Sequence, residues 1–200
     1  MIVNYQNKLL DLINTLDYRP KLLLHSCCGP CSTTVITMLK EYFDITVFYY
    51  NPNIEPREEY EKRKSEQIRL IKELNSEFVK FLESDYANEE FRSVTKGLEE
   101  EKEGGARCSV CFKLRLEKTA LKAKELDYEY FGTTLTVSPY KNSYIINEIG
   151  AMLEKNFGVK YLYSDFKKND GYKKSIELSK KYNLYRQNYC GCLFGRDNHV

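Results

Sequence analysis

The stretch KLLLHSCCGPC, residues 21–31, sets the pattern for the rest of the chain. Residues 21–26 form a short apolar run typical of a buried strand. The Gly29-Pro30 pair then interrupts the chain before a helical pattern over about residues 32–42. A strand followed by a short loop and a helix is the beginning of a βαβ unit. Three cysteines therefore stand on the loop at the carboxyl end of the first predicted strand.

The same alternation continues along the chain. Further strands are predicted at residues 45–50, 78–82, 130–135 and 159–163. Helical patterns cover residues 9–16, 58–74, 89–96, 109–126, 139–156 and 173–182, and an irregular tail follows. Ser138 is the expected N-cap of the helix that begins near Pro139. Strands separated by single helices predict an α/β fold with a mostly parallel sheet and helices on both faces. We expect one domain over residues 1–200.

Composition excludes several classes of protein. With 42% hydrophobic residues, 17 Tyr and 10 Phe in 200 residues, the chain is not disordered. Residues 1–18 show no apolar leader, and no apolar run approaches the roughly 18 residues that span a membrane. We therefore expect a cytoplasmic monomer without a membrane contact. The seven cysteines are an odd number and cannot all pair within one chain. Clustered thiols in a reducing compartment point to metal or redox chemistry.

The cysteines form three groups, and the first two precede or open predicted helices. A helix N-terminus favours thiolate over thiol, and Arg107 adds a cation beside the second group. In such sheets ligands bind outside the carboxyl ends of the strands, where the first group stands. The groups are Cys27, Cys28 and Cys31; Cys108 and Cys111; and Cys190 and Cys192.

Three kinds of chemistry fit these groups. Cys28, Cys31, Cys108 and Cys111 could hold zinc in a tetrahedron, which would make the chain a zinc-stapled RNA-binding module. Cys28-Gly-Pro-Cys31 also repeats the dithiol frame of thioredoxin-like oxidoreductases. An iron–sulfur cluster needs up to four thiolates, which Cys27 and Cys28 on one loop could supply with Cys108 and Cys111 on the other. The cluster accounts for more of the cysteines than the other two alternatives.

The tail pair, Cys190 and Cys192, is separated by one residue. A disulfide at this spacing is strained and easily reduced, as expected of a pair that carries two electrons. Cys31 is then left as an accessory ligand or a small core residue.

Charge is unevenly distributed although the chain carries only +2 overall. Residues 54–103 carry a net −5, and residues 160–200 carry a net +5. The basic stretch interleaves lysines with tyrosines, which suits an RNA backbone with unstacked bases. Solvated helix faces are the alternative interpretation of the same residues.

Six motifs in order together resemble the epoxyqueuosine reductases of the QueH type over residues 21–192. They are His25-Ser-Cys-Cys-Gly-Pro-Cys31, Gly105-Ala-Arg-Cys-Ser-Val-Cys-Phe-Lys-Leu-Arg-Leu116, Thr133-Thr-Leu135 with Ser138-Pro-Tyr-Lys141, Asp165-Phe-Lys-Lys168, Gly171-Tyr172 and Tyr185-Arg-Gln-Asn-Tyr-Cys-Gly-Cys192. The resemblance implies a HUP-like, Rossmann-type fold. It also implies the cobalamin-independent reduction of epoxyqueuosine to queuosine at the tRNA wobble position.

The resemblance further implies a [4Fe-4S] cluster and allows an additional iron ion beside it. Its pattern carries over to Cys27, Cys28, Cys108 and Cys111 as cluster ligands and to Cys190 and Cys192 as a redox-active disulfide. The electron donor stays unidentified.

Substrate and proton-transfer residues complete the expected site. His25, two residues before Cys27, is a candidate proton donor, with a structural role in holding the cysteine loop as the alternative. Tyr140, Asp165 and Tyr189 are other candidates, with structural or substrate-positioning roles as their alternatives. The remaining candidates contact the substrate or the tRNA anticodon loop, the lysines and the arginine through phosphate. These are Tyr140, Lys141, Asp165, Lys167, Lys168, Arg186 and Tyr189.

Overall fold

A computed structural model describes residues 3–196 of the chain. Its centre is a five-stranded, all-parallel sheet in the order β3-β2-β1-β4-β5. The strands are β1 (Lys21–His25), β2 (Asp44–Tyr49), β3 (Val79–Glu83), β4 (Tyr130–Thr133) and β5 (Lys160–Tyr161). The predicted α/β fold with a parallel sheet is confirmed, in a Rossmann-like arrangement.

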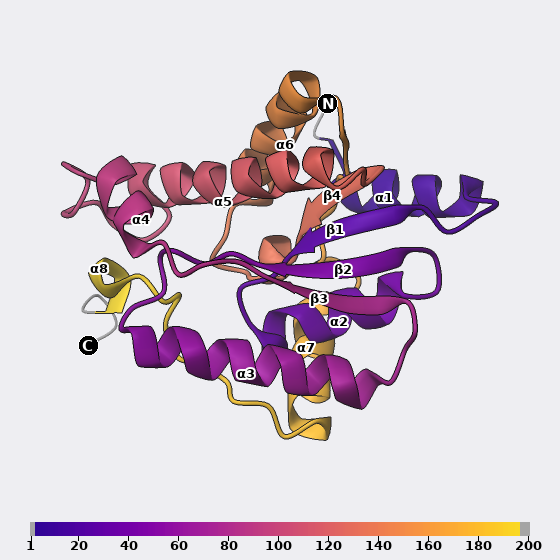
Figure 1. Cartoon of the computed structure of the whole chain (residues 1–200), viewed down its shortest axis with the longest axis horizontal. Helices are drawn as coiled ribbons and strands as arrows, with labels where there is room; N and C mark the ends of the chain where they lie inside the picture. The colour runs from indigo at the N-terminus through magenta and orange to yellow at the C-terminus, as the bar shows by residue number, and fades with distance from the viewer. Residues whose placement is uncertain (1–2, 197–200) are drawn as a thin grey trace.

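Helices cover both faces of the sheet (Figure 1). They are α1 (Tyr5–Thr15), α2 (Gly29–Leu39), α3 (Arg57–Leu74), α4 (Asn88–Val94), α5 (Ala106–Glu125), α6 (Ser143–Phe157), α7 (Gly171–Lys181) and α8 (Leu193–Arg196), with a 3-10 turn η1 (Leu135–Val137). Helices α5 and α6 lie on one face, and α2, α3 and α7 lie on the other. None of the helices within residues 3–196 has the length and apolarity needed to cross a membrane.

The alternation of side chains in β1 divides the core in two. Leu22 and Leu24 pack with residues of α1 and α2, whereas Leu23 packs with residues of α5 and α6 on the opposite face. All three leucines are fully buried. Strand β1 therefore holds the two helical layers together at the middle of the sheet.

The order of the strands reverses direction between β1 and β4. Strands β2 and β3 lie on one side of β1, whereas β4 and β5 lie on its other side. A parallel sheet has its ligand crevice outside the carboxyl ends of the strands at such a point. The chain leaving β1 is the cysteine loop, and the chain leaving β4 is Thr134 followed by η1. This topology places the first cysteine group at the crevice.

Three local predictions need correction or comment. Helix α6 begins at Ser143, and the Asn142 side chain accepts hydrogen bonds from the backbone of its first turn, so Ser138 is not its N-cap. The tail is not wholly irregular, because it contains the short helix α8. The prediction of one domain concerned residues 1–200, of which 1–2 and 197–200 lie outside the described residues, and it stays a prediction.

Candidate metal and redox centre

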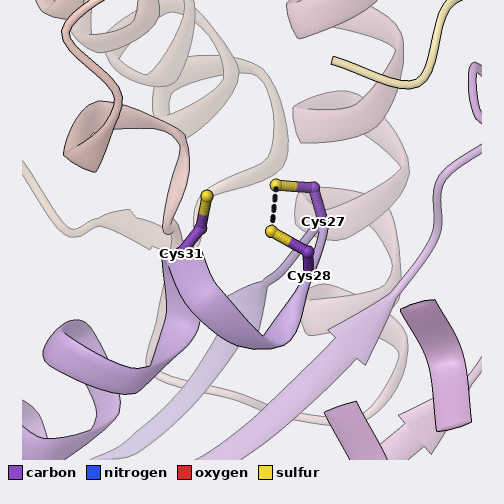
Figure 2. A group of neighbouring side chains, drawn as sticks. All are labelled: Cys27, Cys28 and Cys31. Carbon is purple, nitrogen blue, oxygen red and sulfur yellow. Dashed lines mark hydrogen bonds between the residues drawn. The ribbon is translucent and has the colours of Figure 1, made fainter. Parts of the chain in front are cut away.

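The first cysteine group sits where β1 turns into α2. Cys28 is the N-cap of α2 in an extended conformation, and Pro30 stands in the first helical turn. The Sγ atoms of Cys27, Cys28 and Cys31 all lie within 4.8 Å of one another. The Cys27 thiol donates to Cys28 Sγ at 3.8 Å (Figure 2). The turn thus directs three sulfurs to one point, as a shared metal site requires.

The surroundings of this group favour a thiolate at Cys28. Hydrogen bonds from Cys27 and Cys31 hold the pKa of the Cys28 thiol well below its usual value. The nearby Arg63 charge and the Gln187 amide, whose Nε2 lies 3.1 Å from Cys28 Sγ, act in the same direction. The same hydrogen bonds raise the pKa values of Cys27 and Cys31. The loop is built to carry negative charge on sulfur.

The second group opens helix α5. Burial raises the pKa of the Cys111 thiol to about 12, and burial also raises the pKa of Cys108. Cys108 Sγ accepts a hydrogen bond from the Gly104 backbone at 3.2 Å. Arg107 is buried and donates to the backbone oxygens of Leu98 and Glu99 at 3.1 and 2.7 Å. Arg107 therefore anchors the loop that leads into this cysteine pair.

The tail pair is held by a buried arginine of α3. Arg63 donates from Nη1 to the Cys190 oxygen at 2.9 Å and from Nη2 to the Tyr189 oxygen at 3.3 Å. Its Nε pairs with Glu59 at 2.7 Å. Gly191 between the two cysteines has φ of 119°, a conformation that other residues rarely adopt. A Cβ there would stand 2.8 Å from Ile54, so the position requires glycine.

All three groups meet at the carboxyl end of the sheet. A small hollow of about 20 Å³ is lined by Cys108, Cys111, Cys190 and Cys192. A larger cavity of about 230 Å³ is lined by Cys27, Cys31 and Cys190. Cys190 borders both spaces and therefore lies between the first and second cysteine groups. Six of the seven cysteines thus line two adjoining spaces, and Cys28 lies against Cys27.

The grouping differs in detail from the expected ligand set. Within residues 3–196, the cysteines that lie within mutual ligand distance are Cys27, Cys28 and Cys31. Cys108 and Cys111 border the neighbouring hollow and are not part of this close group. Cys31 is therefore a neighbour of the expected ligands Cys27 and Cys28 rather than a residue left over.

The residues present fit a negatively charged, sulfur-bound metal centre. Thiolates are the ligands of zinc and of iron–sulfur clusters. Arg115 is fully buried beside the cysteines, and neither its Nη1 nor its Nη2 has a hydrogen-bond partner among the described residues. A buried cation without a partner is costly unless a negative group completes the site. The site is compatible with a metal or iron–sulfur group.

Four of the predicted substrate residues line the larger cavity: Tyr140, Lys141, Arg186 and Tyr189. Burial lowers the pKa of Lys141, but the negative charge of Cys190, Cys27 and Cys31 outweighs it, so the net pKa is raised. Arg186 donates to the Ser179 hydroxyl at 3.2 Å. The cavity is therefore lined by sulfur together with cationic and aromatic groups.

The other three lie outside this cavity. Asp165 forms an ion pair with Lys167 at 2.8 Å, and Lys167 Nζ reaches the Lys141 oxygen at 3.4 Å. Lys168 is exposed and borders a separate hollow of about 520 Å³ next to α2 and α7. Asp165 and Lys167 thus support the loop that carries Lys141, and Lys168 faces a different part of the surface.

His25 has both ring nitrogens engaged inside the protein. Nε2 donates to the Tyr50 oxygen at 3.1 Å, and Nδ1 lies 3.0 Å from the Thr133 hydroxyl. Burial, with the Arg115 charge, lowers the pKa of His25 to about 3, so the ring is neutral. Its position joins the ends of β1, β2 and β4 and does not border the cavity. This arrangement favours the structural role weighed for His25 over proton donation.

Several residues of the site were not predicted from the sequence. Gln187 and Arg115 stand inside the quoted motifs, so their place in those motifs was the available signal. No sequence signal marked Arg63 or Asn53, which also lie at the site. Arg63 lies in a highly charged helix and reads as a solvated side chain, and Asn53 reads as a turn residue after a strand.

Comparison with known proteins matches residues 22–198 to the family described as epoxyqueuosine reductase QueH. A relative in Streptococcus pyogenes, named epoxyqueuosine reductase QueH, is 49% identical over 88% of this chain and 70% of its own length. Relatives of the same name in Staphylococcus epidermidis and Thermotoga maritima are 46% and 39% identical. These alignments cover 96% and 86% of this chain and 84% and 88% of the relatives. The chain belongs to the QueH epoxyqueuosine reductase family.

Proposed function

We propose that the protein reduces epoxyqueuosine in tRNA to queuosine, acting in the cytoplasm. The reaction converts an epoxide into an alkene and releases one water, which takes two electrons and two protons. The observation that carries the proposal is that the first and third cysteine groups line a cavity with cationic and aromatic walls, while the second and third groups line the adjoining hollow. Membership of the QueH family supports the same activity.

A [4Fe-4S] cluster is the proposed cofactor, with Cys27, Cys28, Cys108 and Cys111 as its ligands. When bound, such a cluster supplies electrons one at a time. The lowered pKa of Cys28 supports a thiolate-bound centre at this place, as does the Arg115 guanidinium, whose Nη1 and Nη2 have no hydrogen-bond partner among the described residues. Cys31 lies close enough to Cys27 and Cys28 to serve as an accessory ligand for an additional iron ion.

Cys190 and Cys192 are the proposed two-electron reservoir. Two thiols that become one disulfide release two electrons and two protons, which balances the reduction of one epoxide. Cys190 borders the substrate cavity, and Cys192 borders the adjoining hollow. An electron donor that is still unidentified must reduce the pair again after each turnover. Arg63 and Gly191 hold the pair in place.

The tRNA anticodon loop is the proposed partner of the cavity. Lys141 and Arg186 would contact phosphate, and Tyr140 and Tyr189 would position the modified base, which must leave its stack to enter. Tyr140 is 72% exposed at the rim and is well placed to meet a nucleotide first. Asp165 and Lys167 would support the loop that carries Lys141, and Lys168 would contact phosphate at the separate hollow beside α2 and α7.

The test is conversion of the nucleoside itself. Anaerobically purified protein is incubated with a low-potential reductant and tRNA that carries epoxyqueuosine, and the digested nucleosides are analysed by mass spectrometry. We expect a product lighter by one oxygen atom. Iron-loaded protein that binds this tRNA and leaves the epoxide intact would contradict the proposal. A zinc-stapled RNA-binding module would bind the tRNA without iron and leave the epoxide intact. A thiol oxidoreductase would reduce protein disulfides without metal.

A further inference from the structure

Arg115 lies on α5, one helical turn after Cys111, and its side chain is completely buried. Its Nε donates to the Cys111 oxygen at 3.2 Å, and its guanidinium lies 5.7 Å from the centre of the Phe112 ring. Nη1 and Nη2 have no hydrogen-bond partner among residues 3–196. One end of the guanidinium is thus anchored, and the other end is unsatisfied.

The unsatisfied end belongs to the hollow between the second and third cysteine groups. Arg115 lines this hollow together with Cys108, Cys111, Cys190 and Cys192. Asn53 lines it as well, is completely buried, and has no hydrogen-bond partner for either side-chain amide atom among the described residues. Arg107 and the Glu103 carboxylate also line the hollow, so two guanidinium groups border it together with one carboxylate. The buried amide and guanidinium atoms without a partner indicate that a polar, negatively charged group completes this space.

The other buried arginines near the cysteines have partners of a different kind, although Arg107 Nε has none among the described residues. Arg63 has the Glu59 carboxylate as its counter-charge, and Arg107 donates to two backbone oxygens. The pKa of Arg115 is lowered by burial, but the negative charge of Cys111, Cys190, Cys27 and Cys108 outweighs this effect and raises it. A thiolate formed in any of the three cysteine groups would therefore act as a counter-charge for Arg115.

We propose that Arg115 is a positioning residue that balances the charge of the sulfur-bound redox centre and raises its reduction potential. This inference rests on the proposed function. A centre that accepts one electron gains one negative charge, and no bond forms or breaks. A fixed cation in a buried, low-dielectric site stabilises the more negative, reduced form more than the oxidised form. The side-chain amide of Asn53 adds two further polar atoms, Nδ2 and Oδ1, to the lining of the same hollow.

The experiment compares midpoint potentials of the iron-loaded, anaerobic protein by spectroelectrochemical titration. Arg115→Met and the shorter Arg115→Gln remove the charge, and Arg115→Lys keeps it. Lys122→Met is the control, because Lys122 lies on the same helix, is only partly buried and pairs with Glu125. We expect more negative potentials for Arg115→Met and Arg115→Gln, and potentials close to wild type for Arg115→Lys and Lys122→Met.

A role limited to helix packing gives a different result. The melting temperature would then fall in the three Arg115 variants while the potential stayed at the wild-type value, which would overturn the inference alone. A drop in potential for Arg115→Lys as large as that for Arg115→Met would also overturn it, because charge would not be the cause. A wild-type protein that binds no iron would overturn the proposed function, and the inference with it.

Discussion

Replacement of Arg63 by methionine tests how the redox-active tail is held. Arg63 is 1% exposed and connects α3 to the backbone oxygens of Tyr189 and Cys190, with Glu59 as its counter-charge. Removal of one partner of a buried ion pair costs about 3–5 kcal/mol. Glu59 keeps a bond from the Tyr185 hydroxyl at 3.1 Å, which offsets part of this loss. We therefore expect the free energy of unfolding to fall by about 2–4 kcal/mol.

The control is a second arginine on the same helix. Arg69 also donates to tail backbone oxygens, those of Tyr182 and Asn183, but its side chain is 36% exposed. Arg69→Met should cost no more than about 1 kcal/mol because its ion pairs are solvated. Urea unfolding gives both values, and the rate of alkylation of Cys190 reports the local effect.

Arg63→Met should speed alkylation of Cys190, and Arg69→Met should leave it unchanged. The double variant Arg63→Met with Glu59→Gln should recover about 1–2 kcal/mol, because the carboxylate is no longer left without its partner. Equal stability losses for Arg63→Met and Arg69→Met, with the same Cys190 reactivity, would refute the reasoning.

Three further substitutions probe the tail and the surface. Cys190→Ser should keep the visible absorption of the cluster but abolish turnover, and loss of the absorption would instead make Cys190 a ligand. Gly191→Ala should lower the free energy of unfolding by about 1–3 kcal/mol, since φ of 119° strains alanine, and an unchanged melting temperature would contradict this. Lys167→Ala with Lys168→Ala should weaken tRNA binding and reduce the salt dependence by about 0.7–0.9 per lost phosphate contact, and an unchanged slope would make both lysines solvated.

The sheet and the first cysteine loop were predictable because their signals are local. The apolar run of β1, the glycine and proline after it and the helical pattern that follows lie within about twenty residues. The start of α6 was placed wrongly because Ser138 and Asn142 are both good N-cap residues. The chain makes a turn at Ser138, where the Lys141 backbone donates to its oxygen, before the helix begins.

The positions of the site residues depend on contacts that local pattern does not encode. Arg63 and Cys190 are 127 residues apart in sequence, and nothing in a charged helix marks one arginine as buried. The neutral state of His25 likewise follows from its burial between three strand ends. The motifs located the cysteines, but the fold was needed to show that Cys31 stands beside Cys27 and that Cys190 borders both spaces.

The central claim is that the gathered cysteines hold an iron–sulfur centre, and one measurement tests it most directly. Anaerobically purified protein is analysed for iron, acid-labile sulfide and zinc, together with its visible absorption. The account predicts a brown protein with about four iron and four sulfide per chain, and additional iron if the accessory site is filled. Stoichiometric zinc in a colourless protein without iron or sulfide would contradict it.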